Sequence, residues 1–256
     1  MPQVTYERLE LVKKILDEKG SVSFKELSEQ FPEVSIMTLR RDIERLEFEG
    51  YAMKIRGGAK RIDLSEQREA AYSQRVKQNP LVKAMLAREA LKFIETGRSV
   101  FLDSGTTIME LAKILPDIHL SIVTSGPNIA LEIIKKQKPT VNLIGGTVNA
   151  DNCSVAGAGA LLCLKNMNID LAFTSPSGFS QSGGFTVGNY AECEVKRAVI
   201  KKANKVIMLM SKDKLNKSLP FTFAVLKDID IIITDAAADR DFFKAALKAG
   251  VKIIKV

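Results

Sequence analysis

Apolar residues near the start of the chain recur at helical spacing. Three of them share one face of a predicted helix over residues 6–18, at intervals of three and four: Leu9, Val12 and Leu16. A second, shorter helix is predicted to begin after Ser23, because Ser23 and Glu26 have the spacing of a capping box. The chain is therefore predicted to open with two helices in succession.

The segment 34–46 has the most informative pattern. Ser35 is a natural N-cap, because its hydroxyl can accept hydrogen bonds from the free amides of the first helical turn. Four apolar residues follow at helical spacing and predict a buried stripe: Ile36, Leu39, Ile43 and Leu46. At about 100° per residue, the opposite face carries Met37, Thr38, Arg41 and Arg45, with Arg40 on its flank.

This arginine-bearing face suits the major groove of DNA, where arginine reads guanine edges or binds phosphate. A surface helix with solvated charges is the alternative, and the pattern alone does not exclude it. The neighbouring segments favour DNA. Residues 31–34 join the two helices at helix-turn-helix spacing. Residues 51–61 form a ribbon with a Gly-Gly turn, four cations and no acid, which is typical of a wing that contacts the DNA backbone.

We therefore predict a winged helix-turn-helix DNA-binding domain over residues 1–61, with the helix-turn-helix at about 23–46 and the wing at 51–61. The residues predicted to contact DNA are Ser35, Met37, Thr38, Arg40, Arg41, Arg45, Lys54, Arg56 and Lys60. The chain has a formal net charge of +8, which favours a polyanionic partner. Residues 1–61, however, hold twelve Lys and Arg against eleven Asp and Glu, so the DNA prediction rests on local placement.

The remainder of the chain has a different pattern. Residues 62–78 are polar and charged and are predicted to be a linker. From residue 79 onward, short apolar runs alternate with helix-like stretches. Runs that are apolar on both faces suit the strands of a covered parallel sheet. Residues 79–256 are therefore predicted to form an α/β domain with a twisted open sheet, which binds ligands beyond the carboxyl ends of its strands.

Three loops that follow predicted strands are rich in glycine, serine and threonine. Gly, Ser and Thr there can approach an anion closely and donate hydrogen bonds to it, and helix amides add to this. Each loop alone is also typical of an ordinary turn. The residues predicted to bind an anionic effector are Asp103, Ser104, Gly105, Thr106, Thr107, Thr124, Ser125, Gly145 and Gly146, with the cations Lys196 and Lys214. The Gly- and Ser-rich segment 175–188 is a candidate ligand loop.

The cysteine and histidine content and the lengths of the apolar runs argue against a metal-binding, disulfide-bonded or membrane-spanning protein. The three cysteines, at positions 153, 163 and 193, have no paired or metal-ligand spacing, and His119 is the single histidine. We expect no structural metal, no cofactor and no disulfide framework. We also expect a cytoplasmic protein, because no apolar run is long enough to span a bilayer.

The N-terminal motif is specific enough to indicate a family. Val34-Ser35, Thr38, Arg40-Arg41-Asp42, Leu46, Gly50 and Gly57-Gly58-Ala59 together resemble the signature of the DeoR-type bacterial sugar-operon repressors. The resemblance extends to Asp103-Ser-Gly-Thr-Thr, Gly145-Gly146 and Glu192-x-Glu194-x-Lys196-Arg197. It implies a sensor domain similar in fold to ribose phosphate isomerases that binds phosphorylated sugars. It also implies a repressor of a sugar-catabolic operon that these sugars release from operator DNA.

A single short recognition helix reads few base pairs, so we expect a symmetric homo-oligomer, a dimer or a tetramer. The alternative function is a sugar-phosphate isomerase or acyl-transfer enzyme, which would need a carboxylate base beside a phosphate site. Carboxylates that could supply it are Asp103, Asp170, Glu192 and Glu194, but no spacing identifies a catalytic pair.

Overall fold

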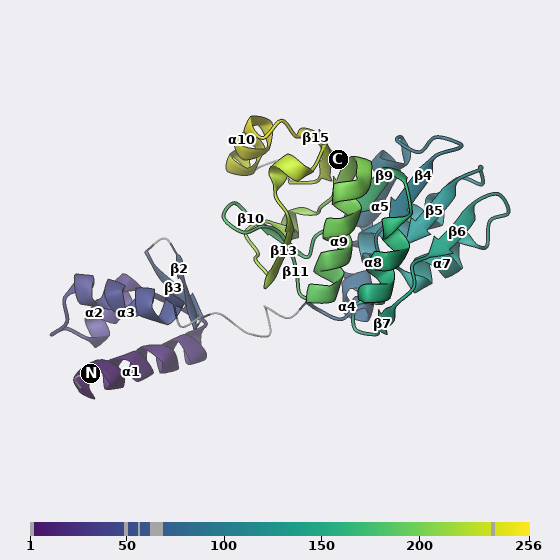
Figure 1. Cartoon of the computed structure of the whole chain (residues 1–256). Coiled ribbons are helices and arrows are strands. Elements are labelled where there is room, and N and C mark those ends of the chain that lie inside the picture. The colour runs from purple at the N-terminus through teal and green to yellow at the C-terminus, as the bar shows by residue number, and fades with distance from the viewer. Residues whose placement is uncertain (1–2, 49–50, 56, 62–68, 237–238) are drawn as a thin grey trace. The chain divides into compact units, whose positions relative to one another are not determined.

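A computed structural model describes residues 3–48, 51–55, 57–61, 69–236 and 239–256 (Figure 1). The chain divides into two compact units, Met1–Arg68 and Glu69–Val256. Residues 69–78, predicted as part of a linker, belong to the second unit and include the helix α4 (Tyr72–Lys77). The rest of the predicted linker, residues 62–68, lies outside the described residues. In the part of the chain that the structure describes, no helix is both long and apolar enough to cross a bilayer.

The described residues of the first unit form three helices and a three-stranded antiparallel sheet in the order β1-β3-β2. The elements are α1 (Gln3–Lys19), β1 (Ser21–Ser23), α2 (Phe24–Gln30), α3 (Ile36–Phe48), β2 (Ala52–Ile55) and β3 (Gly58–Arg61). Ser23 begins α2 with both hydrogen bonds of the capping box. The apolar faces of the helices meet in one core that includes Leu9, Val12, Leu16, Leu27, Leu39, Ile43 and Leu46. The arrangement is the predicted winged helix-turn-helix.

One residue of the predicted stripe on α3 is not in this core. Leu39, Ile43 and Leu46 are fully buried, whereas Ile36 is 50% exposed. Ile36 is the first residue of α3 and lies nearly one turn before Leu39, beyond the edge of the core. The prediction that Ile36 is buried is therefore wrong.

The second unit is built on a seven-stranded sheet in which every neighbouring pair is parallel, in the order β15-β14-β12-β9-β4-β5-β6 (Figure 1). The strands are β4 (Ser99–Leu102), β5 (Ser121–Thr124), β6 (Thr140–Leu143), β9 (Ile169–Thr174), β12 (Ala203–Leu209), β14 (Ile231–Thr234) and β15 (Lys252–Lys255). The helices are α4, α5 (Pro80–Leu91), α6 (Thr106–Ile114), α7 (Pro127–Ile133), α8 (Ala158–Lys165), α9 (Tyr190–Lys202) and α10 (Arg240–Lys248), with the short 3-10 helices η1 (Lys212–Lys214) and η2 (Leu226–Asp228). This is the predicted open α/β sheet.

Alternate residues of the central strands face opposite sides of the sheet. Val100 and Leu102 of β4 pack in one cluster with α5, α6 and α7, whereas Phe101 packs in another with α8 and α9. Because both faces are covered by helices, the central strands carry apolar residues on both faces, as the sequence pattern predicts.

Two smaller sheets complete the unit. β10 (Gly178–Ser180), β11 (Gly184–Val187) and β13 (Phe221–Ala224) form an antiparallel sheet, and β7 (Thr147–Asn149) pairs with β8 (Ser154–Ala156). Most of the Gly- and Ser-rich segment 175–188 is thus a hairpin rather than a loop. Its aromatic residues Phe179 and Phe185 are buried in a core cluster with α10, and its first residues, Ser175 and Pro176, line the cleft described below.

The strand order reverses direction at β4. The chain proceeds from β4 outward through β5 to β6, and then returns to place β9 on the other side of β4, followed by β12, β14 and β15. The point between β4 and β9 is a topological switch point. In open α/β sheets, ligands bind beyond the carboxyl ends of the strands at such a point.

Candidate DNA-binding surface and effector cleft

The face of α3 opposite the core is exposed to solvent. Met37 is 71% exposed, and Ser35, Arg40 and Arg41 are also exposed. Ser35 caps the helix as predicted: its Oγ accepts a hydrogen bond from the Thr38 amide at 3.2 Å and lies 2.9 Å from the Thr38 Oγ1. These two hydroxyls therefore hold the start of the helix, while Met37 and the arginines project outward.

An ion pair that sequence reasoning missed fixes α3 against α1. Asp42 is only 5% exposed, and its carboxylate accepts hydrogen bonds from Arg8 Nε at 2.6 Å and Nη2 at 3.1 Å. The hydrogen bond to Asp42 raises the pKa of Arg8. A bidentate pair of this kind gives orientation as well as energy, so it sets the angle at which α3 is presented. The signal in the sequence was an acid placed directly after two arginines.

The remaining cations predicted to bind DNA differ in their surroundings. The Arg40 guanidinium lies 5.5 Å from the centre of the Phe24 ring, and Arg45 is half-buried. Lys54 pairs with Glu44 of α3 at 2.7 Å, which couples the wing strand β2 to the recognition helix. Lys60 is exposed on β3, and Arg56 lies outside the described residues.

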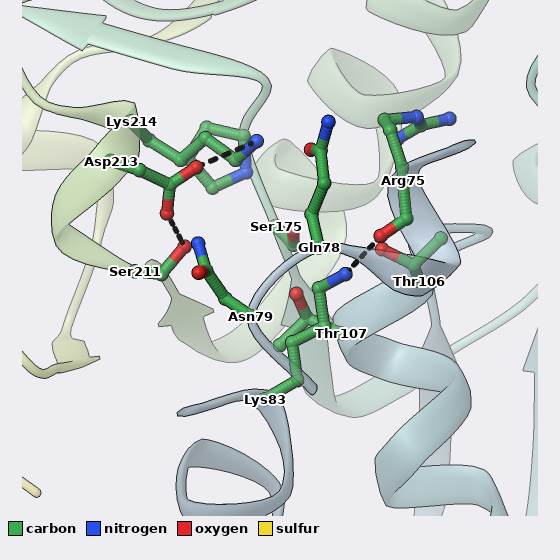
Figure 2. Close-up of a pocket in the computed structure, with 11 residues that line it drawn as sticks. Arg75, Gln78, Asn79, Lys83, Thr106, Thr107, Ser175, Ser211, Asp213 and Lys214 are labelled. Atoms are coloured by element: carbon green, nitrogen blue, oxygen red, sulfur yellow. Dashed lines mark hydrogen bonds and ion pairs between the residues drawn. The ribbon is translucent and has the colours of Figure 1, made fainter. Parts of the chain in front are cut away.

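The second unit has a cleft at the topological switch point, shown in Figure 2. Thr106 and Thr107 follow β4, Ser175 and Pro176 follow β9, and three residues follow β12. The other wall comes from α4 and the start of α5. The full lining is Arg75, Gln78, Asn79, Lys83, Thr106, Thr107, Ser175, Pro176, Ser211, Asp213 and Lys214.

The cleft is cationic and meets the start of a helix. Arg75, Lys83 and Lys214 contribute three positive charges against the single carboxylate of Asp213. Thr106 and Thr107 are the first residues of α6, whose N-cap Gly105 has no side chain to bond the free amides of the first turn. Helix amides, two threonine hydroxyls and cations in one place suit a phosphate group.

Lys83 is the lining residue with the most perturbed environment. It is 6% exposed, and its ammonium donates a hydrogen bond to the carbonyl oxygen of Arg75. Burial, together with the nearby charges of Lys214 and Arg75, lowers its pKa to about 8. Sequence reasoning missed Lys83 because it follows no strand. Its position three residues before the buried Leu86, on the apolar face of α5, was the available signal.

The segment that supplies the second wall is fastened to the rest of the unit. Arg75 pairs with Glu69 at 2.6 Å, and its Nε donates to the Ala70 carbonyl at 2.9 Å. The Tyr72 amide donates to the Asp151 carbonyl at 2.6 Å, and Asn128 Nδ2 donates to the Tyr72 hydroxyl at 2.6 Å. Residues 69–78 are therefore an integral part of the α/β unit.

Asp103 and Lys196, both predicted to bind the effector, form a buried ion pair with each other. Neither is among the residues that line the cleft, and they are 1% and 2% exposed. Lys196 also donates to the Ser175 carbonyl at 3.1 Å, and Asp103 accepts from the Ser175 amide at 3.2 Å. The pair therefore holds the Ser175 wall of the cleft from behind.

Glu192 extends this buried group. It lies 3.4 Å from Lys196 on the same face of α9, and burial raises its pKa to about 7. Asn152 donates to the Glu192 carboxylate and in turn accepts a hydrogen bond from the Ser154 hydroxyl at 2.8 Å. The cluster thus connects the end of β4 through α9 to the β7–β8 hairpin. In the described part of the chain, no group of three or more His, Cys, Asp or Glu side chains is arranged to hold a metal ion.

Four other predicted effector residues lie away from the cleft lining. Thr124 Oγ1 donates to the Leu102 carbonyl at 2.6 Å, and the Ser125 carbonyl accepts from the Val155 amide at 2.7 Å. Gly145 and Gly146 are exposed beyond the edge strand β6. The physical reason is the strand order, because β5 and β6 extend from β4 in the direction opposite to β9 and β12. The three loops follow neighbouring strands at one edge of the sheet, as predicted, but only the β4 loop lines the cleft, and an effector role for the other two stays a prediction. Ser104 and Gly105 connect Asp103 to Thr106, the first residue of α6 and of the cleft lining in this loop.

Comparison with known proteins gives two family matches and several relatives. Residues 8–65 match the DeoR-like helix-turn-helix domain, and residues 78–236 match the DeoR C terminal sensor domain. The chain is 32% identical to the L-fucose operon activator of Escherichia coli K12, over 84% of this chain and 88% of that protein. It is 29% identical to a putative aga operon transcriptional repressor of Escherichia coli O157:H7, over 98% of this chain and 94% of that protein. Among solved structures it resembles ribose 5-phosphate isomerase A of Methanocaldococcus jannaschii, with 16% identity, a TM-score of 0.41 and coverage of 54% of this chain and 55% of that one.

Proposed function

Because the chain belongs to the DeoR family of helix-turn-helix transcriptional regulators, we propose that it represses a sugar-catabolic operon in the cytoplasm and that a phosphorylated sugar releases it from operator DNA. The regulator's two activities fall on the two units: operator binding on α3 and the wing, and effector binding in the cleft at the β4–β9 switch point. The observation that carries the proposal is the meeting of three cations and the uncapped start of α6 in the cleft of the sensor domain.

The polar lining of the cleft supports a sugar phosphate over a bare anion. Gln78, Asn79, Ser175 and Ser211 add amide and hydroxyl groups beside the cations. Sugar hydroxyls are recognised by such neutral donors and acceptors, whereas phosphate is recognised by charge and by helix amides. We assign the phosphate to Thr106, Thr107 and Lys214, and the sugar hydroxyls to the amide and serine side chains.

The surroundings of the candidate bases count against the isomerase alternative. Asp103 and Glu192 are buried around Lys196, Asp170 accepts the Ser99 amide at 2.9 Å, and Glu194 pairs with Arg197 at 2.8 Å. None of these four carboxylates lines the cleft. A general base must reach the proton that it removes. The carboxylate that does line the cleft, Asp213, accepts a hydrogen bond from the Ser211 hydroxyl and pairs with Lys214 at 3.4 Å. These contacts favour a regulator without catalytic turnover.

Operator release tests the proposal directly. Duplexes are selected from a random pool with the full chain, and binding is measured by fluorescence anisotropy while sugar phosphates are added one at a time. We expect at least one sugar phosphate to weaken operator binding, with its unphosphorylated sugar as the matched control. Specific DNA binding that no sugar phosphate changes would contradict the proposed effector. Conversion of a sugar phosphate by the protein would support the enzyme alternative.

We also propose that the regulator binds as a symmetric oligomer, because each chain has one short recognition helix. The selected operator is expected to contain two half-sites related by a dyad or a direct repeat. Sedimentation at micromolar concentration should give a mass that is a multiple of 28.2 kDa. A monomer protecting one isolated half-site would contradict this proposal.

Arg41 is expected to supply base readout. Its side chain is exposed on the face of α3 opposite the core, where a guanidinium can bond guanine in two places. Arg41→Ala should weaken operator binding by about 1–3 kcal/mol and relax sequence preference. Equal losses on operator and random DNA for Arg41→Ala would contradict the assignment.

Lys60 on the wing is expected to contact phosphate. Lys60→Ala should weaken binding to operator and random DNA about equally and reduce the salt slope by about one. Arg56 was predicted to act in the same way as Lys60.

Effector binding is expected to weaken as pH rises through about 8. Lys83 loses its proton near this pH in the empty cleft, whereas a phosphate monoester, with a second pKa of about 6, stays dianionic. Charged groups around Lys83 are Arg75 on α4, Lys214 and Asp213 on η1, and Glu110 on α6. Binding the dianion favours charged Lys83, so the protein must take up a proton above pH 8, and affinity should fall by up to about tenfold per pH unit.

Calorimetric titrations between pH 7 and pH 9.5 measure this dependence. Lys83→Gln should bind the effector more weakly at pH 7 but with a flatter pH profile, because the titrating group is gone. A profile in Lys83→Gln as steep as that of the wild type would assign the pH dependence to another residue.

A further inference from the structure

The first turn of α3 presents two adjacent large apolar side chains to solvent. Met37 is 71% exposed and Ile36 is 50% exposed. Single exposed apolar residues are ordinary on protein surfaces. These two, however, adjoin each other at the N-terminal end of the recognition helix, which is the end that helix-turn-helix proteins bring to base edges.

The charged residues next to Ile36 and Met37 indicate which kind of partner contacts these two side chains. Ile36 is followed four residues later by Arg40, and Met37 by Arg41, so each apolar side chain has an exposed arginine on the next turn. An apolar contact flanked by two exposed arginines is complementary to a polyanion that also offers an apolar group. The major groove of DNA does so, because the C5 methyl of thymine is exposed there among hydrogen-bonding base edges.

On the premise that the chain binds operator DNA, we propose that Met37 and Ile36 read thymine by contact with its C5 methyl group. Four residues of α-helix rise by about 6 Å, and successive base pairs are about 3.4 Å apart. Met37 and Arg41 therefore reach positions about two base pairs apart. Each operator half-site is expected to contain a thymine at this distance from the guanine that Arg41 reads.

Deoxyuridine tests the contact, because it differs from thymidine only in lacking the methyl group. Each thymine of the selected operator is replaced singly, and the full-length protein is titrated by anisotropy. At the contacted thymine, loss of one buried methyl should weaken wild-type binding about fourfold. Met37→Ala should bind the thymine operator more weakly, and replacing that thymine with deoxyuridine should weaken its binding less than that of the wild type, because a double-mutant cycle reveals the shared contact.

The chain offers a matched control in Leu11, an apolar residue of α1 that is 52% exposed. Leu11→Ala should keep the full deoxyuridine effect. Since Met37 is exposed, Met37→Ala should also keep the wild-type unfolding midpoint, which separates a lost contact from a misfolded domain.

Three results would overturn the inference while leaving DNA binding intact. In the first, every deoxyuridine operator binds the wild type as tightly as its thymine parent. In the second, Met37→Ala remains as sensitive to deoxyuridine as the wild type. In the third, the selected half-site has no thymine within three base pairs of the guanine that depends on Arg41. Failure to select any duplex at all would instead remove the proposed function itself.

Discussion

Lys196→Met is expected to lower the free energy of unfolding of the full chain by about 3–5 kcal/mol. Lys196 is 2% exposed and is paired with Asp103 and Glu192, both of which are also buried. Methionine fills a similar volume but leaves two buried carboxylates without a cation. Lys201→Met, at an exposed position on the same helix, is the matched control and should change stability by no more than about 0.5 kcal/mol.

The pH dependence of this loss distinguishes charge from packing. The pKa of Glu192 is raised to about 7 from its ordinary 4.5, so the folded state holds this proton more tightly than the unfolded state does. Between pH 4.5 and pH 7 the contribution of Glu192 to stability therefore decreases as pH rises. The cost of Lys196→Met should be smaller at pH 5.5, where Glu192 can be neutral, than at pH 8.

Denaturant unfolding at the two pH values measures both effects. A second change, Glu192→Gln in the Lys196→Met background, should restore part of the lost stability at pH 8 because it removes one uncompensated charge. Equal losses at both pH values, with no recovery from Glu192→Gln, would show that Lys196 acts through packing rather than charge.

Lys214→Ala is expected to produce a regulator that stays on its operator when the effector is added. A charge-assisted hydrogen bond contributes about 1.5–3 kcal/mol, so effector affinity should fall about tenfold to a hundredfold. The effector must bind the DNA-incompetent state better than the DNA-bound state, and this coupling is reciprocal. Operator affinity without effector should therefore be normal, whereas release should need a correspondingly higher concentration of sugar phosphate.

Lys217→Ala provides the comparison, because Lys217 is exposed, lies three residues later and does not line the cleft. It should be released as the wild type is. Loss of operator binding by Lys214→Ala would indicate a structural lysine, and normal release would remove Lys214 from the effector site. Thr106→Val and Thr107→Val should weaken effector binding in the same direction and by less, because they remove neutral donors.

The fold could be predicted from the sequence wherever one local pattern decides the structure. Leu39, Ile43 and Leu46 repeat at helical spacing and are buried, and Ser23 and Glu26 form the expected capping box. The loop before α6 was located because Gly105 and the two threonines directly follow an apolar strand. In each case the interacting residues are within a few positions of one another.

The composition of the cleft depends on strand order, which local pattern does not encode. Gly145 and Gly146 have the same chemistry as the β4 loop, but β6 is at the far edge of the sheet. Asp103 and Lys196 are 93 residues apart, and no local spacing reveals that they neutralise each other. Charged residues that suit a phosphate site on sequence grounds are thus buried and bonded to the backbone of Ser175 instead of lining the cleft.

A fragment used to study the α/β unit alone should include residues 69–78, because these residues are hydrogen-bonded to the rest of the unit. The family match for the sensor begins at residue 78, and the sequence suggests residue 79. A fragment starting there would lack Arg75 and the Tyr72 hydrogen bonds to Asp151 and Asn128, and with them the α4 part of one cleft wall. Ligand affinities measured on such a piece would understate those of the intact regulator. The shortest fragment that keeps the wall whole begins at Glu69, whose carboxylate holds Arg75 in place.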